Sequence, residues 1–325
     1  MSALGELFTN LKLTPSRFRE SLFRHDAPTS DRSRSQAVFS NFFLHIQSTR
    51  VHKHSLSWST TWGLGVISLI LFAILCVTGV LLMVYYKPSV GDAYDSIKDI
   101  TYVVPVGRMV RNVHRWAAHG MVITVLLHMA RVFYTGSYFG PRAFNWVIGM
   151  FLLVLTLGLS FTGYLLPWDQ LAFWAVTIGS NIAQSPRELT DALGLTAVMD
   201  IGGMQKHLLL GAGSVGQEAL IRFYVLHVIV LPVIALILCG VHFWRIRKDG
   251  GLNRPVDIDE RLGPDVRNGR AIFREGSGKT YGLMAIVKGK SPVVNRGPEH
   301  TVPAWPHLLY SEILLLVLTT VVMLL

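Results

Sequence analysis

The distribution of apolar and polar residues along the chain predicts its helices. Four uninterrupted apolar stretches occupy residues 62–86, 112–134, 144–166 and 223–244. Each is long enough to cross the roughly 30 Å hydrocarbon core of a bilayer as an α-helix. A fifth stretch, residues 308–325, carries Glu312 near its start and has just enough length. The pattern predicts an all-α integral membrane protein, with a four-helix transmembrane bundle and one additional C-terminal transmembrane helix.

The segments outside these stretches are polar. Residues 1–61 form the N-terminal segment, and within its first 40 residues Arg17, Arg19 and Arg24 interrupt the apolar residues, so a signal peptide's apolar core is missing. This segment is expected either to lie on the membrane surface as an amphipathic helix or to form a solvated tail. Residues 247–307 are rich in Gly, Pro and charge and are interpreted as a cytoplasmic connector. Its Gly278-Lys279-Thr280 is no phosphate loop, because Phe273 stands where that motif needs glycine.

Composition and charge agree with a membrane protein. The chain is 51% hydrophobic and only 15% charged, and a soluble fold would rarely need so much apolar surface. Its net charge is +10, and basic residues flank the first span on its N-terminal side and the fourth on its C-terminal side. Both flanks, and with them the N-terminus, are therefore expected on the cytoplasmic side of the membrane. We expect that membrane to be the inner membrane of a bacterium. A nucleic-acid patch is disfavoured because the charges are scattered around membrane helices.

Four histidines lie inside two of the predicted spans, His114 and His128 in the second and His227 and His242 in the fourth. An imidazole inside a lipid-spanning helix is costly, so four at matched spacing indicate a shared purpose. Fourteen residues rotate a helix through about 1400° and fifteen overshoot four turns by roughly 60°, so each pair lies on one helix face. The members of a pair are ~21 Å apart, one near either membrane surface.

A single span separates the two histidine-bearing helices, so they cross the membrane in the same direction. His114 and His227 are expected at one depth near the extracytoplasmic surface, and His128 and His242 at another near the cytoplasm. Two facing histidines can supply both axial ligands of a haem, whereas zinc would need a third or fourth ligand at each depth. One membrane histidine alone could be a packing residue or a proton relay. Four at paired depths favour two haems, whose bis-histidine ligation suits electron transfer.

Glycines and arginines near these helices fit the same interpretation. Gly65 and Gly79 in the first span, and Gly149 and Gly163 in the third, repeat the spacing of fourteen. Glycine would leave a gap for a haem edge, although it also serves ordinary helix packing. Three arginines stand within three residues of the histidines and could pair with the propionate groups of a haem. Alternatively, they are ordinary arginines at helix ends whose side chains extend toward the membrane surface. These are Arg111, Arg115 and Arg131.

Several strings of residues over roughly positions 50 to 250 resemble the cytochrome b family of quinol-oxidising complexes. They are Arg111-Asn112-Val113-His114-Arg115-Trp116, His128-Met129-Ala130-Arg131, Pro167-Trp168-Asp169-Gln170 and Arg222-Phe223-Tyr224-Val225-Leu226-His227. The fifteen-residue histidine spacing and Ile246-Arg247-Lys248 are similar to the short cytochrome b of cytochrome bf complexes. Pro303-Ala304-Trp305-Pro306 and Leu308-Leu309-Tyr310 resemble the start of subunit IV, joined here to the short cytochrome b.

The resemblance implies a di-haem b subunit of a quinol:cytochrome c (or plastocyanin-like acceptor) oxidoreductase, with residues 62–246 as the di-haem domain. In the family, quinol is oxidised near the extracytoplasmic face. One electron passes to a Rieske iron–sulfur protein and the other crosses both haems to a quinone site near the cytoplasm. The matching positions make His114 and His227 ligands of the outer haem iron, and His128 and His242 ligands of the inner one.

The resemblance also assigns two further sites. The segment from Pro167 to about Ala183, with Trp168, Asp169 and Gln170, corresponds to a wall of the quinol-oxidation pocket. By itself, a proline followed by tryptophan would indicate a helix stop with an interfacial anchor. Arg247, five residues after His242, matches a basic residue near the inner quinone site; by itself it would be a topology charge.

Two departures from the family pattern matter. Gly63 stands where bf complexes have a cysteine that tethers an additional haem, and Cys76 and Cys239 lie deep in helices without a Cys-x-x-Cys-His motif. We therefore expect two non-covalent haem b groups and no covalent haem c. The proton-accepting glutamate of subunit IV is also missing, and Pro298-Glu299-His300 falls in the connector, on the wrong side.

These departures bear on the expected partners. They are quinol and quinone, a Rieske iron–sulfur protein, a separate subunit IV-like chain, a cytochrome c-type acceptor and a second copy of the complex. Two other functions stay open: a di-haem membrane anchor of a dehydrogenase, and a haem-free helical scaffold or transporter. Four ligands on two helices, together with the segment that begins at Pro167, argue against the anchor.

Overall fold

A computed structural model describes residues 29–30, 33–34, 37, 50–52, 56, 58–138, 142–249 and 301–324. The chain divides into two compact units, Met1–Thr49 and Arg50–Leu325. All elements described below belong to the second unit. The predicted amphipathic segment around Leu11 to Phe23, the rejected phosphate motif at Gly278 and the Pro298-Glu299-His300 string lie outside the described residues.

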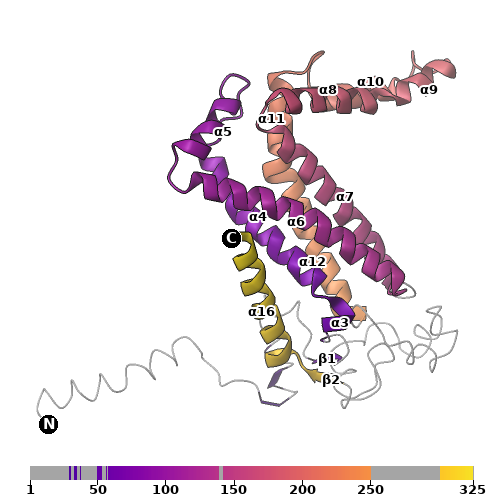
Figure 1. Cartoon of the computed structure of the whole chain (residues 1–325). Helices are drawn as coiled ribbons and strands as arrows, with labels where there is room; N and C mark the ends of the chain where they lie inside the picture. Colours follow the sequence, from indigo (N-terminus) through magenta and orange to yellow (C-terminus); the bar gives the residue numbers. More distant parts are fainter. Residues whose placement is uncertain are drawn as a thin grey trace, which may run out of the picture. The chain divides into compact units, whose positions relative to one another are not determined.

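The described elements are almost all helical (Figure 1). In chain order they are β1 (Arg50–His52), α3 (Trp58–Thr61), α4 (Leu64–Tyr85), α5 (Ala93–Tyr102), α6 (Gly107–Tyr134), α7 (Ala143–Leu165), α8 (Gln170–Gln184), α9 (Pro186–Ala192), α10 (Ile201–Leu210), α11 (Gln217–Val225), the π-helix η4 (Leu226–Val230), α12 (Leu231–Asp249), β2 (Thr301–Pro303) and α16 (Ala304–Leu324).

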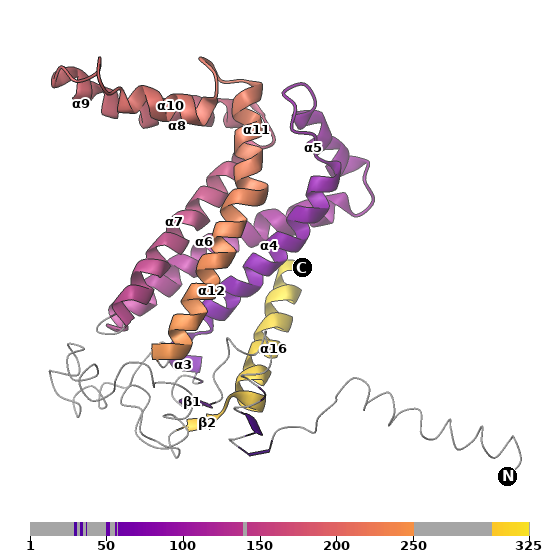
Figure 2. The same cartoon turned by 180° about the vertical axis from the view of Figure 1, so that it is seen from behind.

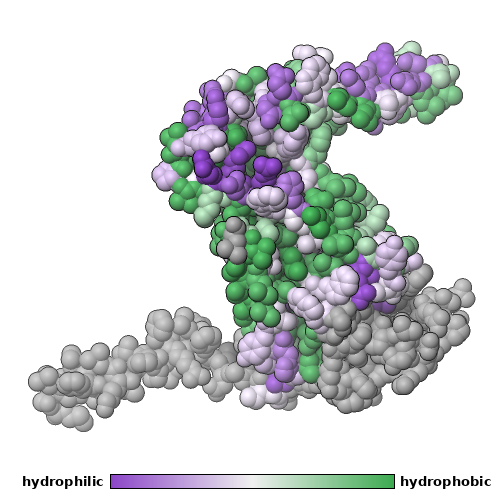
Figure 3. All heavy atoms as spheres, viewed as in Figure 1, coloured by the Kyte–Doolittle hydropathy of each residue, from purple (hydrophilic) through white to green (hydrophobic). Residues whose placement is uncertain are grey.

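Five helices of the described chain are long and apolar enough to cross a membrane, which confirms the all-α membrane fold predicted from the sequence. They are Leu64–Tyr85, Gly107–Tyr134, Ala143–Leu165, Gln217–Ile246 and Pro306–Leu324. Apolar side chains gather along the middle of the helices, and hydrophilic ones gather over α5 and over the α8–α10 region (Figure 3). Because many of these apolar side chains point outward, the helices suit a lipid environment.

The four predicted bundle helices pack as two linked pairs. Helix α4 lies against α6 and α7 lies against α12, while α6 also contacts α7 (Figures 1 and 2). The fourth span is one continuous rod made of α11, η4 and α12. This arrangement sets α6 beside the α11–α12 rod, and these are the two elements that carry the four histidines.

The fifth span packs on the bundle through small residues. Helix α16 contacts α4 and α6, and β2 just before it pairs antiparallel with β1 just before the first span. Gly63 has φ +64°, and a Cβ placed there would lie 2.8 Å from Cδ1 of Leu315. At Gly120 the nearest atom of α16 would be Cε of Met323, at 3.9 Å. Gly63, just before α4, therefore lets Leu315 of α16 approach closely, whereas the contact at Gly120 is an ordinary one.

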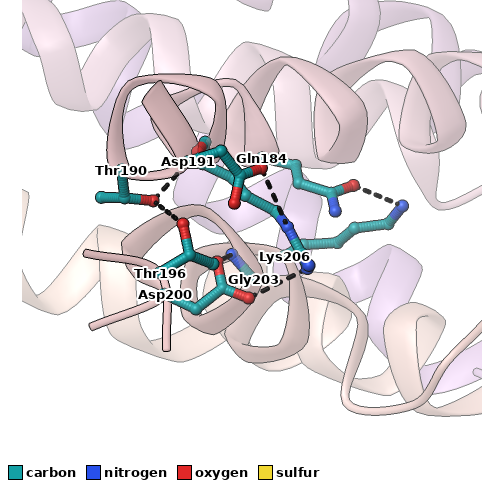
Figure 4. Close-up of polar contacts among 8 residues, drawn as sticks. Gln184, Thr190, Asp191, Thr196, Asp200, Gly203 and Lys206 are labelled. Carbon is teal, nitrogen blue, oxygen red and sulfur yellow. Dashed lines mark hydrogen bonds and ion pairs between the residues drawn. The ribbon is translucent and has the colours of Figure 1, made fainter. Parts of the chain in front are cut away.

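Helices α8, α9 and α10 form a hairpin between the third and fourth spans, which we call the α8–α10 hairpin (Figure 1). Polar contacts hold its two arms together (Figure 4). Lys206 Nζ donates to Asn181 Oδ1 at 3.0 Å and to Gln184 Oε1 at 2.9 Å. Arg187 Nη1 bonds Asp200 Oδ2 at 3.0 Å. These bonds fix α10 against α8 although both helices keep many exposed apolar side chains.

Two small apolar clusters lie at this end of the bundle; the first joins the hairpin to α7 and α11, and the second joins α5 to α11. One is built of Leu165, Ala172, Val176, Leu210, Ala219 and Phe223, and the other of Tyr86, Ala93, Ile100 and Leu220. Trp168 packs against both clusters. At the same junction Arg222 Nη1 donates to the carbonyl oxygens of His207 and Leu208, at the C-terminal end of α10. The rod that bears two of the histidines is thus attached directly to the hairpin.

Candidate functional site

The structure brings the four membrane histidines together as two pairs. The ring centroids of His114 and His227 are 6.3 Å apart with an interplanar angle of 73°. Those of His128 and His242 are 6.5 Å apart at 82°. We call the first the outer pair and the second the inner pair. All four side chains are half-buried between α6 and the α11–α12 rod.

The separation within each pair fits one metal ion held between two imidazoles. Two metal–nitrogen bonds of about 2 Å each, plus the distance from each nitrogen to its ring centre, give roughly 6 Å between centroids. Among the described residues no group of three or more His, Cys, Asp or Glu side chains could hold a metal ion. Each pair can therefore supply only two protein ligands to a metal ion. This suits haem iron, whose other ligands are the nitrogens of the planar porphyrin.

A π-turn explains why fifteen residues separate His227 and His242 while fourteen separate the histidines of α6. His227 lies in η4, where the Leu231 N–H bonds the Leu226 carbonyl, five residues back. Pro232 follows, and proline lacks the N–H that would bond the carbonyl four residues before it. A π-turn accommodates one extra residue in the helix. Because the π-turn takes up one residue, His227 and His242 lie on one face of the rod although fifteen residues separate them. Residues fourteen apart lie on one face of a regular helix in the same way.

Three of the four predicted glycines lie directly against histidine rings. A Cβ at Gly79 would be 3.3 Å from Cε1 of His114, and one at Gly163 would be 2.5 Å from Cε1 of His227. At Gly65 the neighbour is His128 Cε1, also at 3.3 Å. Glycines on α4 and α7 thus make room for the rings of α6 and η4.

Gly149 is different. Its hypothetical Cβ would meet Sδ of Met129 at 3.4 Å, and among the neighbours recorded for this glycine there is no histidine atom. The fourteen-residue glycine repeat therefore has three positions at the imidazoles and one at a methionine beside His128.

Two threonines that the sequence interpretation overlooked contact the outer pair. Thr78 Oγ1 lies 2.8 Å from His114 Nδ1, and Thr162 Oγ1 lies 3.2 Å from His227 Nδ1. The carbonyl of Leu159 is also 3.1 Å from His227 Nδ1. Each threonine directly precedes a glycine that touches the same ring, so the repeated Thr-Gly dipeptide was the signal that could have found them.

These contacts define which ring nitrogen carries the proton. Each threonine hydroxyl already donates its single hydrogen to the carbonyl four residues back, Thr78 to Ile74 at 2.7 Å and Thr162 to Gly158 at 2.8 Å. The hydroxyl can then only accept from the histidine, so Nδ1 carries hydrogen. Nε2 of both outer histidines keeps its lone pair and can bind a metal.

The inner pair has a different environment. His242 Nδ1 is buried and has no hydrogen-bond partner within the described part of the chain. Leu64 precedes Gly65 and Ile148 precedes Gly149, so apolar side chains replace the two threonines at this level. The geometry of the ring pair is nearly the same as that of the outer pair, but the hydrogen bonding is not.

The predicted arginines lie on α6 close to the histidines. Arg111 is half-buried and Arg115 is exposed, one on each side of His114 along the helix. Arg131 follows His128, and its guanidinium lies 5.4 Å from the ring centre of Trp62. The structure therefore places two cations at the outer level and one at the inner level, where acidic groups of a ligand could reach them.

The Pro167-Trp168-Asp169-Gln170 segment forms the turn between α7 and α8, at the outer end of the bundle. Trp168 has φ 51°, a strained value for a bulky residue. Asp169 caps α8, because its Oδ1 accepts the Ala172 N–H at 2.8 Å. Gln170 is the first residue of α8 and is exposed. The backbone of Arg247 lies in α12 beyond His242, so the structure does not bring it near the Pro167 turn.

Comparison with known proteins places the chain among membrane cytochromes. The family described as Cytochrome b/b6/petB matches residues 50–250. The cytochrome b6 of Heliobacterium mobile is 44% identical over 187 residues, which cover 58% of this chain and 82% of that protein. The cytochrome b6 of Prochlorothrix hollandica is 40% identical over 187 residues, 58% of this chain and 79% of that protein.

The fold is also similar to a solved structure described as a hyperthermophilic respiratory Complex III. The TM-score is 0.62 and the sequence identity is 26%, over 85% of this chain. The matched region is 60% of the solved chain, so that chain continues well beyond what is shared.

Proposed function

Because the chain belongs to the cytochrome b/b6 family, a family of electron-transfer subunits in quinol-oxidising membrane complexes, we propose that its bundle holds two non-covalent haem b groups. The outer pair would ligate one iron and the inner pair the other. The observation that carries this proposal is the separation within the pairs, 6.3 and 6.5 Å, which fits one iron between two imidazoles.

The chain's own residues would hold each group rather than react with it. A bound haem supplies reversible one-electron chemistry at its iron, and two histidine ligands leave no open position for oxygen. Gly79 and Gly163 keep the wall open beside the outer rings, and Gly65 does so at the inner level. Arg111, Arg115 and Arg131 would pair with the propionates.

We propose that electrons enter at the outer end and leave at the inner end. The turn at Pro167, Trp168, Asp169 and Gln170 would form one wall of the quinol-oxidation pocket, because it adjoins the outer pair through α7. Arg247 would contribute to the quinone-reduction site beyond His242. The N-terminus and the connector at 247–307 would face the cytoplasm of a bacterium, with residues 308–325 as the subunit IV-like fifth helix.

A partner chain would complete the oxidation pocket. In support, the α8–α10 hairpin exposes large apolar side chains next to the Pro167 turn, among them Leu171, Trp174 and Ile178. Such an exposed apolar surface is typical of a site that another protein or the membrane covers. The proposed partners are a subunit IV-like chain, a Rieske iron–sulfur protein and a cytochrome c-type acceptor, in a complex that forms a homodimer.

We further propose that the chain carries no covalent haem at position 63. Gly63 has φ +64°, which disfavours any side chain, and Leu315 of α16 packs 2.8 Å from where its Cβ would be. A cysteine there would have to adopt a strained backbone conformation and displace the Leu315 side chain before it could attach a ligand.

Haem analysis of the complex purified from its native membrane tests the proposal. We expect pyridine haemochrome spectra to give two haem b per chain, all of it extractable by acidified organic solvent. Copurification of an iron–sulfur protein and a second small membrane chain would support the partner assignment. A preparation with full-length protein but no haem would refute the di-haem function, and copurification with a dehydrogenase instead would refute the partners.

A further inference from the structure

Hydroxyl groups lie beside the outer histidines, whereas Leu64 and Ile148 occupy the corresponding positions of α4 and α7 at the inner level. We propose that Thr78 and Thr162 are positioning residues that hold the outer histidines by Nδ1 and thereby lower the reduction potential of the outer iron relative to the inner iron. This inference rests on the proposed di-haem function. It adds to that function a residue-level cause for the direction of electron flow.

Hydrogen bonds at Nδ1 fix the orientation of both outer histidine rings. His114 Nδ1–H donates to Thr78 at 2.8 Å and His227 Nδ1–H donates to Thr162 at 3.2 Å, since both hydroxyl hydrogens are already given to backbone carbonyls. Each ring is fixed at one nitrogen, and its other nitrogen points its lone pair away from the threonine. The threonines, together with the backbone of Leu75 at His114 and the Leu159 carbonyl at His227, therefore select the nitrogen that binds iron.

These hydrogen bonds also have an electronic effect. When the far N–H of a metal-bound imidazole donates a hydrogen bond, the imidazole becomes more basic. A more basic ligand stabilises the oxidised iron more than the reduced iron, so the potential falls. The two hydroxyls would act on the two histidines that hold one iron, so their effects should add.

The inner pair contrasts with the outer pair. His242 Nδ1 finds no hydrogen-bond partner within residues 58–138, 142–249 and 301–324, and the residues that precede Gly65 and Gly149 are Leu64 and Ile148. Because His242 lacks this hydrogen bond, the inner iron would have at least one less basic ligand than the outer iron. An electron delivered at the outer level would then move toward the inner level, because it passes to the centre of higher potential.

Potentiometric titration of the purified complex, followed in the haem absorption bands, tests this. Thr78→Val and Thr162→Val keep the side-chain shape but remove the hydroxyl. We expect Thr78→Val to lower the oxidised-to-reduced ratio of the outer centre at a fixed ambient potential by roughly threefold to tenfold, where tenfold corresponds to about 59 mV. Thr162→Val should lower it less, because the Leu159 carbonyl at 3.1 Å still accepts from His227 Nδ1. The double variant should shift it further, and the inner centre should not move.

Matched variants separate this effect from a packing change. Thr78→Ser and Thr162→Ser retain the hydroxyl and should retain the wild-type potential. Thr156→Val alters another buried threonine of α7, whose hydroxyl donates to the Leu152 carbonyl at 2.8 Å and, within the described ranges, bonds no histidine. It should leave both potentials unchanged. The EPR signal of the ferric outer centre, which reports ring orientation, should change in the valine variants only.

The possible results are decisive. An outer potential that stays at its wild-type value in the double valine variant, with both haems bound, would overturn this inference and leave the di-haem function standing. An equal shift in Thr156→Val would also overturn it. If Thr78→Val fails to retain the outer haem, Thr162→Val decides: the Leu159 carbonyl keeps His227 in place, and loss of the hydroxyl should still raise the outer potential by a smaller amount. No shift in that variant would then overturn the inference. Absence of haem from the wild-type complex would instead remove the proposed function itself.

Discussion

Gly163 shows how closely single residues shape the proposed outer haem site. A methyl group at this position would lie 2.5 Å from Cε1 and 3.1 Å from Nδ1 of His227, and both distances are shorter than van der Waals contact. At Gly149, on the same helix, the methyl would instead meet the flexible Met129 side chain at 3.4 Å. The same substitution should therefore have different consequences at the two positions.

We expect Gly163→Ala to displace His227 and to weaken outer haem binding by about tenfold or more, since overpacking typically costs about 1–3 kcal/mol. Gly149→Ala, the matched control, should leave both haems bound because the methionine can move. Haem content per chain after gel filtration measures both. Equal haem loss in the two variants would show that the contact with His227 is not what matters.

Tyr86 links the end of the first span to the end of the third. Its O–H donates to the Leu166 carbonyl at 2.6 Å, and its ring stacks on Tyr224 with centroids 5.6 Å apart. Burial, and to a smaller extent the neighbouring Tyr224, raises the pKa of Tyr86 above its usual value of 10.0. The neutral phenol is therefore the form that stabilises the fold.

Tyr86→Phe should lower the free energy of unfolding by about 1 kcal/mol near neutral pH, through loss of one hydrogen bond. Because the pKa of the folded state is raised, this contribution is complete below pH 10 and is lost as the pH rises further. Thermal unfolding of detergent-solubilised protein at pH 8 and at pH above 10 measures the difference. A difference between wild type and variant that grew with pH would contradict the assignment.

At the level of single residues, the sequence revealed the four histidines and the three glycines that touch them, because spacing on a helix encodes which side chains share a face. It did not reveal Thr78 and Thr162 as contacts. A threonine in a membrane helix usually bonds its own backbone, and only the packing of α4 and α7 against the histidines shows the second contact. The roles of all these residues as ligands and supports are proposals.

At the level of elements, the π-turn in the fourth span matters most for the site. It sets the direction of His227, and it arises where Pro232 interrupts the regular hydrogen-bond ladder. If the π-turn serves only to keep His227 and His242 on one helix face, the extra residue that it contains can be deleted without loss of the site.

We expect deletion of Ile229 from η4 to convert the π-turn to regular helix and to keep both haems. Deletion of Ile123, which lies between the histidines of regular helix α6, should rotate one ring of α6 away by about 100° and remove one haem. Haem content and optical spectra of the two deletions measure this. Retention of two haems after the α6 deletion, or loss after the η4 deletion, would contradict the account of the spacing.

The five spans could be predicted from the sequence because long apolar stretches have few alternatives in a membrane. Their ends were less certain: α6 begins at Gly107 and the fourth span at Gln217, several residues before the apolar stretches. The π-turn was missed because periodicity assumes a uniform helix. The hairpin arms beyond Gln184 were missed because Arg187, Asp200 and Lys206 stabilise them by specific contacts rather than by an apolar pattern.

For the whole molecule, attachment of the fifth span is the feature that the family resemblance did not foresee in detail. Helix α16 contacts both α4 and α6, and β2 pairs with β1. Gly63 lies at this contact, with φ +64° and Leu315 nearby. Gly194 has nearly the same φ, +68°, but nothing lies within 4 Å of its hypothetical Cβ.

Gly63→Ala should therefore destabilise the protein more than Gly194→Ala. Both substitutions strain the backbone by about 1 kcal/mol, but only the first also forces Leu315 away, at a further cost of about 1–3 kcal/mol. Thermal unfolding of the two variants measures this, and limited proteolysis reports release of α16. Equal destabilisation would indicate that α16 does not pack closely on Gly63.

The central claim concerns pairing across the molecule: one iron between His114 and His227 and a second between His128 and His242. Optical redox titration of single histidine variants, in the complex purified from membranes, tests it most directly. The account predicts that His227→Ala and His114→Ala abolish the same spectral component and spare the other, while His242→Ala and His128→Ala abolish the second. Loss of different components by His114→Ala and His227→Ala, or of neither, would contradict it.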